Sequence, residues 1–442
     1  MAEMETSASP ALDALTGMEN TAAAPQPSRL WNRNFFLLWQ GQTVSQLGNQ
    51  AFLIAMAIWV KDATGSATLM GLLMTVSALP GVLLAPFGGT FADRHSRIKI
   101  IVGCDLLAAL ASLGLGLVMM ANSSTSLILP LLFAVTVLIG IIKSFFSPAI
   151  QASIPDLVPR EHLPAANSLN HFSIQTSVFA GQALGGVLYR ILGAPLLFIV
   201  DGVSYLFSGI SEMFIRDTWK KPEGRPQEGG AFKAFLHETG EGLRYVWGRG
   251  GMRDFILVAC LLNFLGTPMF VLLPFYVDTV LHVTADWYGY LLAAMSIGAV
   301  AGFLLAGTMR LKGQALGWSL VSGLLLGPLF FSLIGFIANP WAALVLAFAS
   351  GLSLGTVNIY LITLLQLSTP KELRGRVLGL LGTLAGALMP IGMALGGWLG
   401  DLTGKNIPLI FGGAGALSVL VTLALATRRE CRRFLAQEEE NR

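Results

Sequence analysis

A few ionisable side chains lie inside long apolar stretches, where a charge needs either a partner or a function. Asp105 and Lys143 fall at similar depths in two neighbouring stretches, and Asp201 lies well inside a third. Each such charge costs at least about 2.5 kcal/mol near the centre of a membrane helix. A buried aspartate readily binds a proton, because burial disfavours its charged form. Asp201 and Asp105 are therefore candidate proton carriers. A structural Asp105–Lys143 ion pair and a buried supporting role for Asp201 are the alternatives.

His171 is a third candidate for proton coupling, since the ordinary pKa of histidine lies close to neutral pH. It belongs to a row of polar residues at helical spacing that includes Gln175. Glu212 lies four residues before Arg216 at the end of an apolar stretch, so we expect these two to pair at the membrane interface.

Uncharged polar residues also recur at helical spacing within the apolar stretches. Gln42, Gln46 and Asn49 follow an i, i+4, i+7 pattern, which puts them within about 60° of one helix face. Uncompensated amides do not face lipid, so these residues either line a substrate pathway or bridge neighbouring helices. A threonine such as Thr356 can instead bond its own helix backbone. The candidate pathway residues are Gln42, Gln46, Asn49, His171, Gln175, Asn263, Thr267, Phe270, Thr356 and Tyr360.

The elements that must position these residues are membrane-spanning helices. Hydrophobic residues make up 54% of the chain and charged residues 12%, far from the quarter expected of a soluble protein. Apolar runs of about twenty residues, each long enough to cross about 30 Å of hydrocarbon, recur along the chain. We predict an all-α membrane protein with twelve such helices, at 34–60, 68–92, 98–121, 127–149, 165–189, 195–215, 254–280, 286–309, 315–337, 341–366, 376–400 and 407–427.

Charge distribution predicts the orientation. With both termini inside, only Lys61, Arg190 and Lys405 of 28 basic residues fall in outer loops. We therefore expect an integral membrane protein with both termini in the cytoplasm. The basic loops suit an anionic lipid surface better than nucleic acid. The three cysteines avoid the outer loops and imply no disulfide framework, and the sequence indicates neither a cofactor nor a metal site.

An internal repeat divides the chain. At a constant shift of 211 residues, Pro159-Arg-Glu matches Pro370-Lys-Glu, and Gly181-Gln-Ala-Leu-Gly-Gly-Val-Leu matches Gly392-Met-Ala-Leu-Gly-Gly-Trp-Leu. We predict a disordered tail (1–30), a six-helix half (31–215), a linker with an amphipathic helix or an ordinary solvated loop (216–253), a second six-helix half (254–427) and a tail (428–442). The glycines expected in close helix packing are Gly181, Gly185, Gly186, Gly392, Gly396 and Gly397.

The loop after the second span reads Gly89-Thr-Phe-Ala-Asp-Arg-His-Ser-Arg-Ile-Lys. It resembles the G-x-L-A-D-R-x-G-R-K signature of the major facilitator superfamily, with Ser96 in place of the second glycine. The resemblance implies the major facilitator fold, two pseudo-symmetric six-helix halves, and a gating motif of Gly89, Asp93, Arg94 and Arg97. In that family the motif contacts the eleventh helix and stabilises the outward-facing state.

A longer run indicates a branch of that family. It is Ile154-Pro-Asp-Leu-Val-Pro-Arg-Glu-His-Leu, followed by Pro195-Leu-Leu-Phe-Ile-Val-Asp-Gly and Glu372-Leu-Arg-Gly-Arg-Val. Together these segments resemble the macrolide-efflux and enterobactin-exporter branch. This resemblance implies efflux of a small molecule powered by a proton gradient.

We therefore expect a secondary active transporter that works as a monomer and exports a small amphiphilic compound, such as a drug, a macrolide-like or a siderophore-like molecule. Import or lipid flipping on the same fold, and a non-transporting receptor or scaffold, are the alternatives. The sequence shows no phosphate-binding loop, metal-ligand cluster or catalytic triad outside the membrane, which argues against an enzyme.

Overall fold

The computed structural model describes residues 29–122, 124–217, 231–309, 311, 313–371 and 373–431. These residues form helices and connecting turns, with no strand among them. The helices are α2 (Arg33–Thr64), α3 (Ala67–Arg94), α4 (Arg97–Ala121), α5 (Thr125–Leu157), the short 3-10 helix η1 (Arg160–His162), α6 (Leu163–Met213), α7 (Ala231–Trp247), α8 (Gly250–Thr279), α9 (Asp286–Met309), α10 (Gly313–Ile334), α11 (Pro340–Ser368), α12 (Arg374–Leu402) and α13 (Ile407–Thr427).

Gly193 breaks α6 into two membrane spans. Within the described residues eleven helices are long and apolar enough to cross a membrane, and α6, at 51 residues, is long enough to cross twice. Gly193 has φ 74° and ψ 170°, a left-handed backbone that residues with a Cβ rarely adopt, and Pro195 follows it. The expectation of twelve spans in an all-α protein is therefore confirmed.

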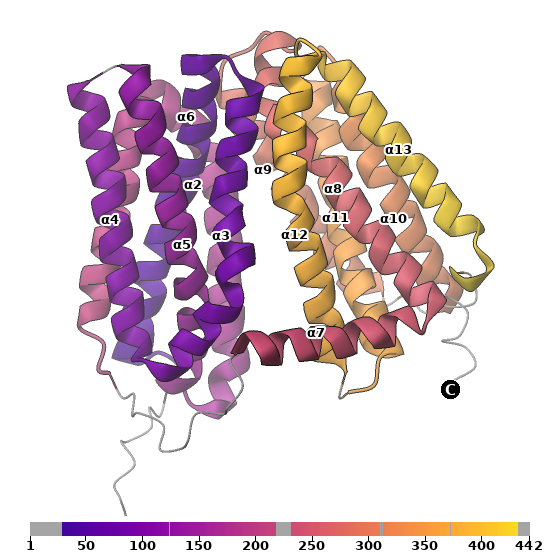
Figure 1. Ribbon diagram of the computed structural model, residues 1–442, viewed down its shortest axis with the longest axis horizontal. Helices are drawn as coiled ribbons and strands as arrows, with labels where there is room; N and C mark the ends of the chain where they lie inside the picture. The colour runs from indigo at the N-terminus through magenta and orange to yellow at the C-terminus, as the bar shows by residue number, and fades with distance from the viewer. Residues whose placement is uncertain are drawn as a thin grey trace, which may run out of the picture.

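The spans form two bundles side by side (Figure 1). The first contains α2 to α6 and the second contains α8 to α13, while α7 crosses one end of the molecule beneath the second bundle and reaches α3 at the edge of the first. We call that end, where the described chain also ends after α13, the terminal end, and the opposite one the far end. On α7, Tyr245 donates a hydrogen bond to the Ser368 carbonyl at 3.3 Å, which ties this helix to the second bundle.

The repeat in the sequence recurs as a repeat in packing. A Cβ at Gly181 or Gly185 of α6 would touch Gln50 or Ile54 of α2, and one at Gly392 or Gly396 of α12 would touch Thr267 or Pro268 of α8. In each half the glycine pair thus lets a later helix approach the first helix of its own bundle.

Glycines also make close contacts between the bundles. A Cβ at Gly71 of α3 would collide with the carbonyl oxygen of Met393 on α12, and one at Gly289 of α9 would collide with that of Gln182 on α6. Gln182 and Met393 are equivalent positions in the sequence repeat. The two bundles therefore meet through two symmetry-related contacts in which main-chain atoms touch.

Candidate functional site

The polar face of α2 has two different environments. Gln46 and Asn49 line a cavity inside the first bundle. Gln42 faces α6 instead, where its Nε2 donates to Oε1 of Glu212 at 2.8 Å. The three amides share a helix face, as their spacing indicates, but one of them bridges two helices and is 6% exposed.

The cavity has a volume of about 210 Å³ and lies among α2, α4, α5 and α6. Its lining mixes ionisable, amide, hydroxyl and apolar groups, namely Ser45, Gln46, Asn49, Asp105, Ile142, Lys143, Phe146, Ser147 and Tyr205. Within it, Oδ1 of Asn49 accepts hydrogen bonds from Nζ of Lys143 at 2.9 Å and from the hydroxyl of Tyr205 at 3.4 Å. The amide thus holds the one cation of this lining, the half-buried Lys143.

Asp105 and Lys143 line this cavity together, as their similar depth indicates, but they form no ion pair within 4.0 Å. Lys143 bonds Asn49 because the α2 amide approaches it more closely than the α4 carboxylate does. Asp201 lies beside the cavity without exposure to solvent, and its Oδ2 accepts a hydrogen bond from Ser112 at 2.7 Å. The cavity region therefore contains two of the three residues expected to carry protons.

Glu212 has a different partner from the one that its sequence position predicts. It is 0% exposed, and its Oε1 accepts hydrogen bonds from Gln42 at 2.8 Å and Ser208 at 3.3 Å, not from Arg216. α6 ends its regular turns at Met213, so Arg216 leaves the helix and its backbone N–H bonds Asn34. The stripe Asp201, Tyr205, Ser208, Glu212 was the available signal, because its helical spacing puts Glu212 on the buried face.

The other pathway candidates lie outside this cavity. His171 and Gln175 of α6 and Asn263 of α8 are exposed in the structure. Thr267 and Thr356 bond carbonyls of their own helices, at 2.9 Å to Asn263 and 2.9 Å to Ser353. Phe270 packs on Phe331 with ring centroids 5.0 Å apart, and Tyr360 is buried in the apolar core of the second bundle. A role for these residues in substrate binding stays a prediction.

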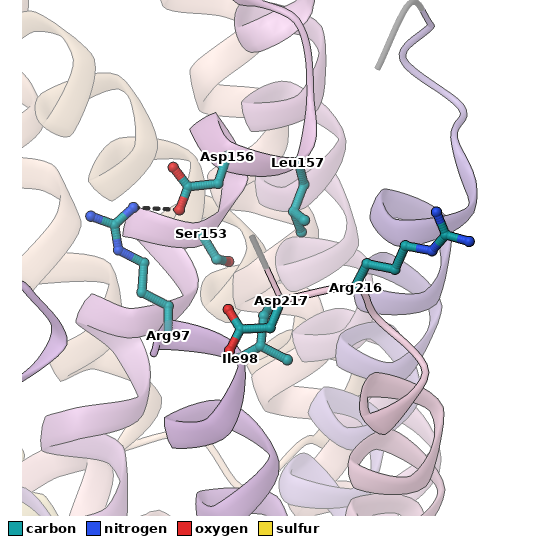
Figure 2. Close-up of a pocket in the computed structure, with 7 residues that line it drawn as sticks. All are labelled: Arg97, Ile98, Ser153, Asp156, Leu157, Arg216 and Asp217. Carbon is teal, nitrogen blue, oxygen red and sulfur yellow. Dashed lines mark hydrogen bonds and ion pairs between the residues drawn. The ribbon is translucent and has the colours of Figure 1, made fainter. Parts of the chain in front are cut away.

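The gating motif lies at the terminal end, between α3 and α4. Asp93 and Arg94 are exposed, while Arg97 donates to Oδ2 of Asp156 on α5 at 2.6 Å (Figure 2). Gly89 has open space around it, and its neighbour Gly88 is the residue that lies against α5. The ion pair of Arg97 stays within the first bundle in this structure, and the latch between bundles stays a prediction.

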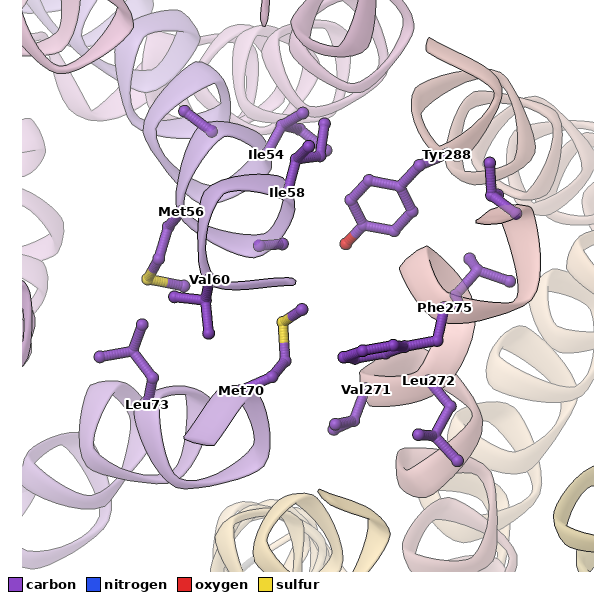
Figure 3. Close-up of a cluster of buried hydrophobic side chains, with 14 of the residues drawn as sticks. Ile54, Met56, Ile58, Val60, Met70, Leu73, Val271, Leu272, Phe275 and Tyr288 are labelled. Atoms are coloured by element: carbon purple, nitrogen blue, oxygen red, sulfur yellow. The ribbon is translucent and has the colours of Figure 1, made fainter. Parts of the chain in front are cut away.

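The far end is closed by an apolar cluster between the bundles (Figure 3). Ile58 of α2 and Met70 of α3 face Phe275 of α8 and Tyr288 of α9, and all four are at most 6% exposed. Two ion pairs flank the cluster at this end, Lys61–Asp278 and Arg190–Asp286, each at 3.5 Å. Asp278 is thus an exposed residue of this end and not part of the cavity.

Comparison with known proteins agrees with this architecture. The family model of the Major Facilitator Superfamily matches residues 38–391. Macrolide efflux protein A of Streptococcus pyogenes is 24% identical over 424 residues, which cover 91% of this chain and 98% of that protein. The multidrug efflux pump Tap of Mycolicibacterium fortuitum is 27% identical over 366 residues, which cover 81% and 87% of the two chains.

Two solved structures are also similar. A bacterial homologue of the iron transporter ferroportin in an inward-facing state has a TM-score of 0.65 at 18% identity, covering 90% of this chain and all of that one. A POT family transporter in complex with a thioalcohol-conjugated peptide has a TM-score of 0.69 at 12% identity, covering 89% and 95%. At this identity the likeness concerns the fold.

Proposed function

Because the chain belongs to the Major Facilitator Superfamily, a family of membrane transporters, we propose that it exports a small amphiphilic compound by alternating access, driven by proton entry. The observation that carries this proposal is the polar cavity inside the first bundle, where Asp105 and Lys143 lie among amides, hydroxyls and rings. Relatives named for macrolide and multidrug efflux support the direction.

The size and lining of the cavity suit part of an amphiphile. At about 210 Å³ it is smaller than the 300–1,000 Å³ of pockets that enclose a drug-sized molecule. It therefore takes one polar or cationic group of the compound, while the apolar remainder lies between the bundles. Gln46 and Asn49 donate and accept hydrogen bonds there, and Phe146 and Tyr205 provide ring surfaces.

Alternating access requires that the closed far end open. The apolar cluster at that end contains no covalent or metal link among the described residues, so rocking of the bundles can separate it.

In the proposed coupling, the residue that carries the proton is Asp105, Asp201 or His171. A membrane potential contributes about 2.3 kcal/mol per charge per 100 mV. A pH gradient adds about 1.4 kcal/mol per unit.

We further propose that the protein is a monomer in the bacterial inner membrane with both termini in the cytoplasm. The concentration of basic residues in the loops of the terminal end supports this orientation. Its partners are then the exported compound, protons and membrane lipid.

Transport in proteoliposomes tests the proposal. The full chain is reconstituted, a pH gradient is imposed, and erythromycin and ethidium are followed in both directions against protein-free vesicles. We expect accumulation in the compartment from which protons leave, and collapse of that accumulation when a protonophore is added. If neither compound moves faster than in protein-free vesicles, the proposal is wrong for these two probes. If they move but ignore the pH gradient, the proposed proton coupling is wrong.

A further inference from the structure

Two buried carboxyl groups meet at the side of the cavity. Asp105 of α4 is 1% exposed and Glu212 of α6 is 0% exposed, and their carboxyl groups lie within hydrogen-bonding reach of one another. Glycines permit this approach: a Cβ at Gly209 of α6 would lie 3.3 Å from that of Asp105, and one at Gly41 of α2 would lie 3.5 Å from Oε1 of Glu212. Three helices thus converge around the two acids.

A hydrogen bond between two carboxyl groups needs a proton on one of them, since carboxylates only accept. Gln42 and Ser208 supply donors to Oε1 of Glu212, whereas Oε2 of Glu212 and Oδ2 of Asp105 are buried and have no donor among the described residues. One shared proton satisfies these oxygens. Two ionised carboxylates in contact would repel each other in a low-dielectric site.

The surrounding charges also favour the state in which Asp105 and Glu212 share one proton. The titratable groups that face the pair are Lys143 on α5, Asp201 and Tyr205 on α6, and Cys104 on α4, while α2 contributes the amides of Gln42 and Asn49. Three carboxyl groups and one ammonium group therefore share this region. Full ionisation would leave two net negative charges without counter-ions, so protons must balance them.

The two acids are not equivalent. Asp105 lines the cavity, whereas Glu212 lies behind it and is held by Gln42 of α2. We propose that Asp105 and Glu212 form one shared proton site, with Asp105 as the member that exchanges the proton with the cavity and Glu212 as its fixed partner. This inference rests on the proposed proton-coupled export and names the site that carries the coupling.

The site links protonation to helix position. When the proton leaves Asp105 for cavity water, the pair gains a second negative charge and the hydrogen bond between α4 and α6 is lost. The repelling carboxylates then favour separation of these helices, or the arrival of a cationic group of the compound at Asp105. Return of a proton restores the bond. Glu212 keeps the Gln42 donor throughout, so α2, whose next turns line the cavity, moves with α6.

Infrared difference spectroscopy of the full chain in lipid nanodiscs tests the site without reference to transport. The protonated pair gives a carboxyl C=O band that disappears as the pH is raised. We expect Asp105→Asn and Glu212→Gln each to abolish this band, and the surface control Glu161→Gln to retain it. A band that survives both substitutions, or that is lost in Asp201→Asn and retained in Glu212→Gln, overturns the proposal.

A milder variant guards against loss of folding. Gln42→Ala keeps both carboxyl groups and removes one donor that favours the ionised pair, so the band should disappear at a higher pH than in the wild type. In proteoliposomes, Glu212→Gln should lose pH-driven accumulation of ethidium at least tenfold relative to the wild type, and the surface control Glu161→Gln should keep it. Retained accumulation overturns the coupling role of the pair. If transport by the wild type does not depend on the pH gradient, the proposed function is wrong, but the infrared experiment still tests whether the two carboxyl groups share a proton.

Discussion

The carboxylate of Asp401, in the last turn of α12, accepts a hydrogen bond from the hydroxyl of Ser66, the N-cap residue of α3, at 2.7 Å. It also accepts the backbone N–H groups of the next two residues, Ala67 and Thr68, each at 2.9 Å. The first N–H groups of a helix have no partner within it, and its N-terminus favours negative charge. One bundle thus caps a helix of the other at the far end.

Asp401→Ala should weaken closure of the far end. Loss of a helix cap costs about 1 kcal/mol, which corresponds to a population shift of about fivefold. The measurement is the distance distribution between spin labels on Ser126→Cys and Leu409→Cys, two exposed positions near the far end of different bundles, after the native cysteines are replaced. The expected result is a larger fraction of long distances.

Asp401→Asn provides the matched control for that experiment. Asparagine keeps one acceptor oxygen and caps helices well, so its distance distribution should lie between those of the wild type and Asp401→Ala. Identical distributions for all three proteins would show that the cap does not influence the conformational equilibrium.

Gly71→Ala should destabilise the closed far end more strongly. The new methyl group would collide with the carbonyl oxygen of Met393, and overpacking of this kind costs about 1–3 kcal/mol. Gly81→Ala on the same helix is the control, because no atom lies within 4 Å of its Cβ position. Thermal unfolding in detergent measures the effect, and equal melting temperatures for the two variants would contradict it.

Gln46→Ala should reduce the affinity for the transported compound. Removal of one hydrogen-bonding amide from the cavity costs about 1 kcal/mol, a several-fold change in dissociation constant. Val44→Ala on the exposed face of the same helix should leave affinity unchanged. Erythromycin or ethidium binding by tryptophan fluorescence gives both constants, and the idea fails if Gln46→Ala binds as the wild type does.

Asp93→Asn should change the balance between the inward-open and outward-open conformations. It should change the free energy of unfolding by no more than about 0.5 kcal/mol, because Asp93 is exposed and lies outside both apolar cores. Asp156→Asn removes the ion pair of Arg97 within the first bundle and separates that contact from a latch between bundles. Cysteine labelling at the two ends reads out the bias. Unchanged accessibility in Asp93→Asn, or the same change in both variants, would argue against a latch through Asp93.

Much of the fold was predictable, because a helix that crosses lipid needs about twenty consecutive apolar residues. The lengths of the apolar runs predicted the twelve spans, and the repeated glycine segment indicated which helices are equivalent. The break at Gly193 was placed within a few residues, between the expected spans 165–189 and 195–215. What the structure adds is how the fifth and sixth spans join: no loop separates them, and the chain turns at a single residue with positive φ, Gly193.

The site was only partly predictable, since helical spacing gives the face of a residue but not its neighbour. Gln42 and Asn49 share a face, yet one bonds Glu212 and the other bonds Lys143, because α6 and α5 approach α2 at different heights. Glu212 was assigned to Arg216 by sequence proximity. The contact it makes spans 170 residues, which local spacing cannot indicate.

The main-chain contacts at Gly71 and Gly289 join the two bundles without using the residues that line the cavity. The groups that touch there are carbonyl oxygens of Met393 and Gln182, which every amino acid has, so side-chain substitution elsewhere leaves these contacts intact. The lining of the cavity lies on other helices of the first bundle. Substitutions that change the cavity lining can therefore accumulate while these contacts between the bundles stay the same.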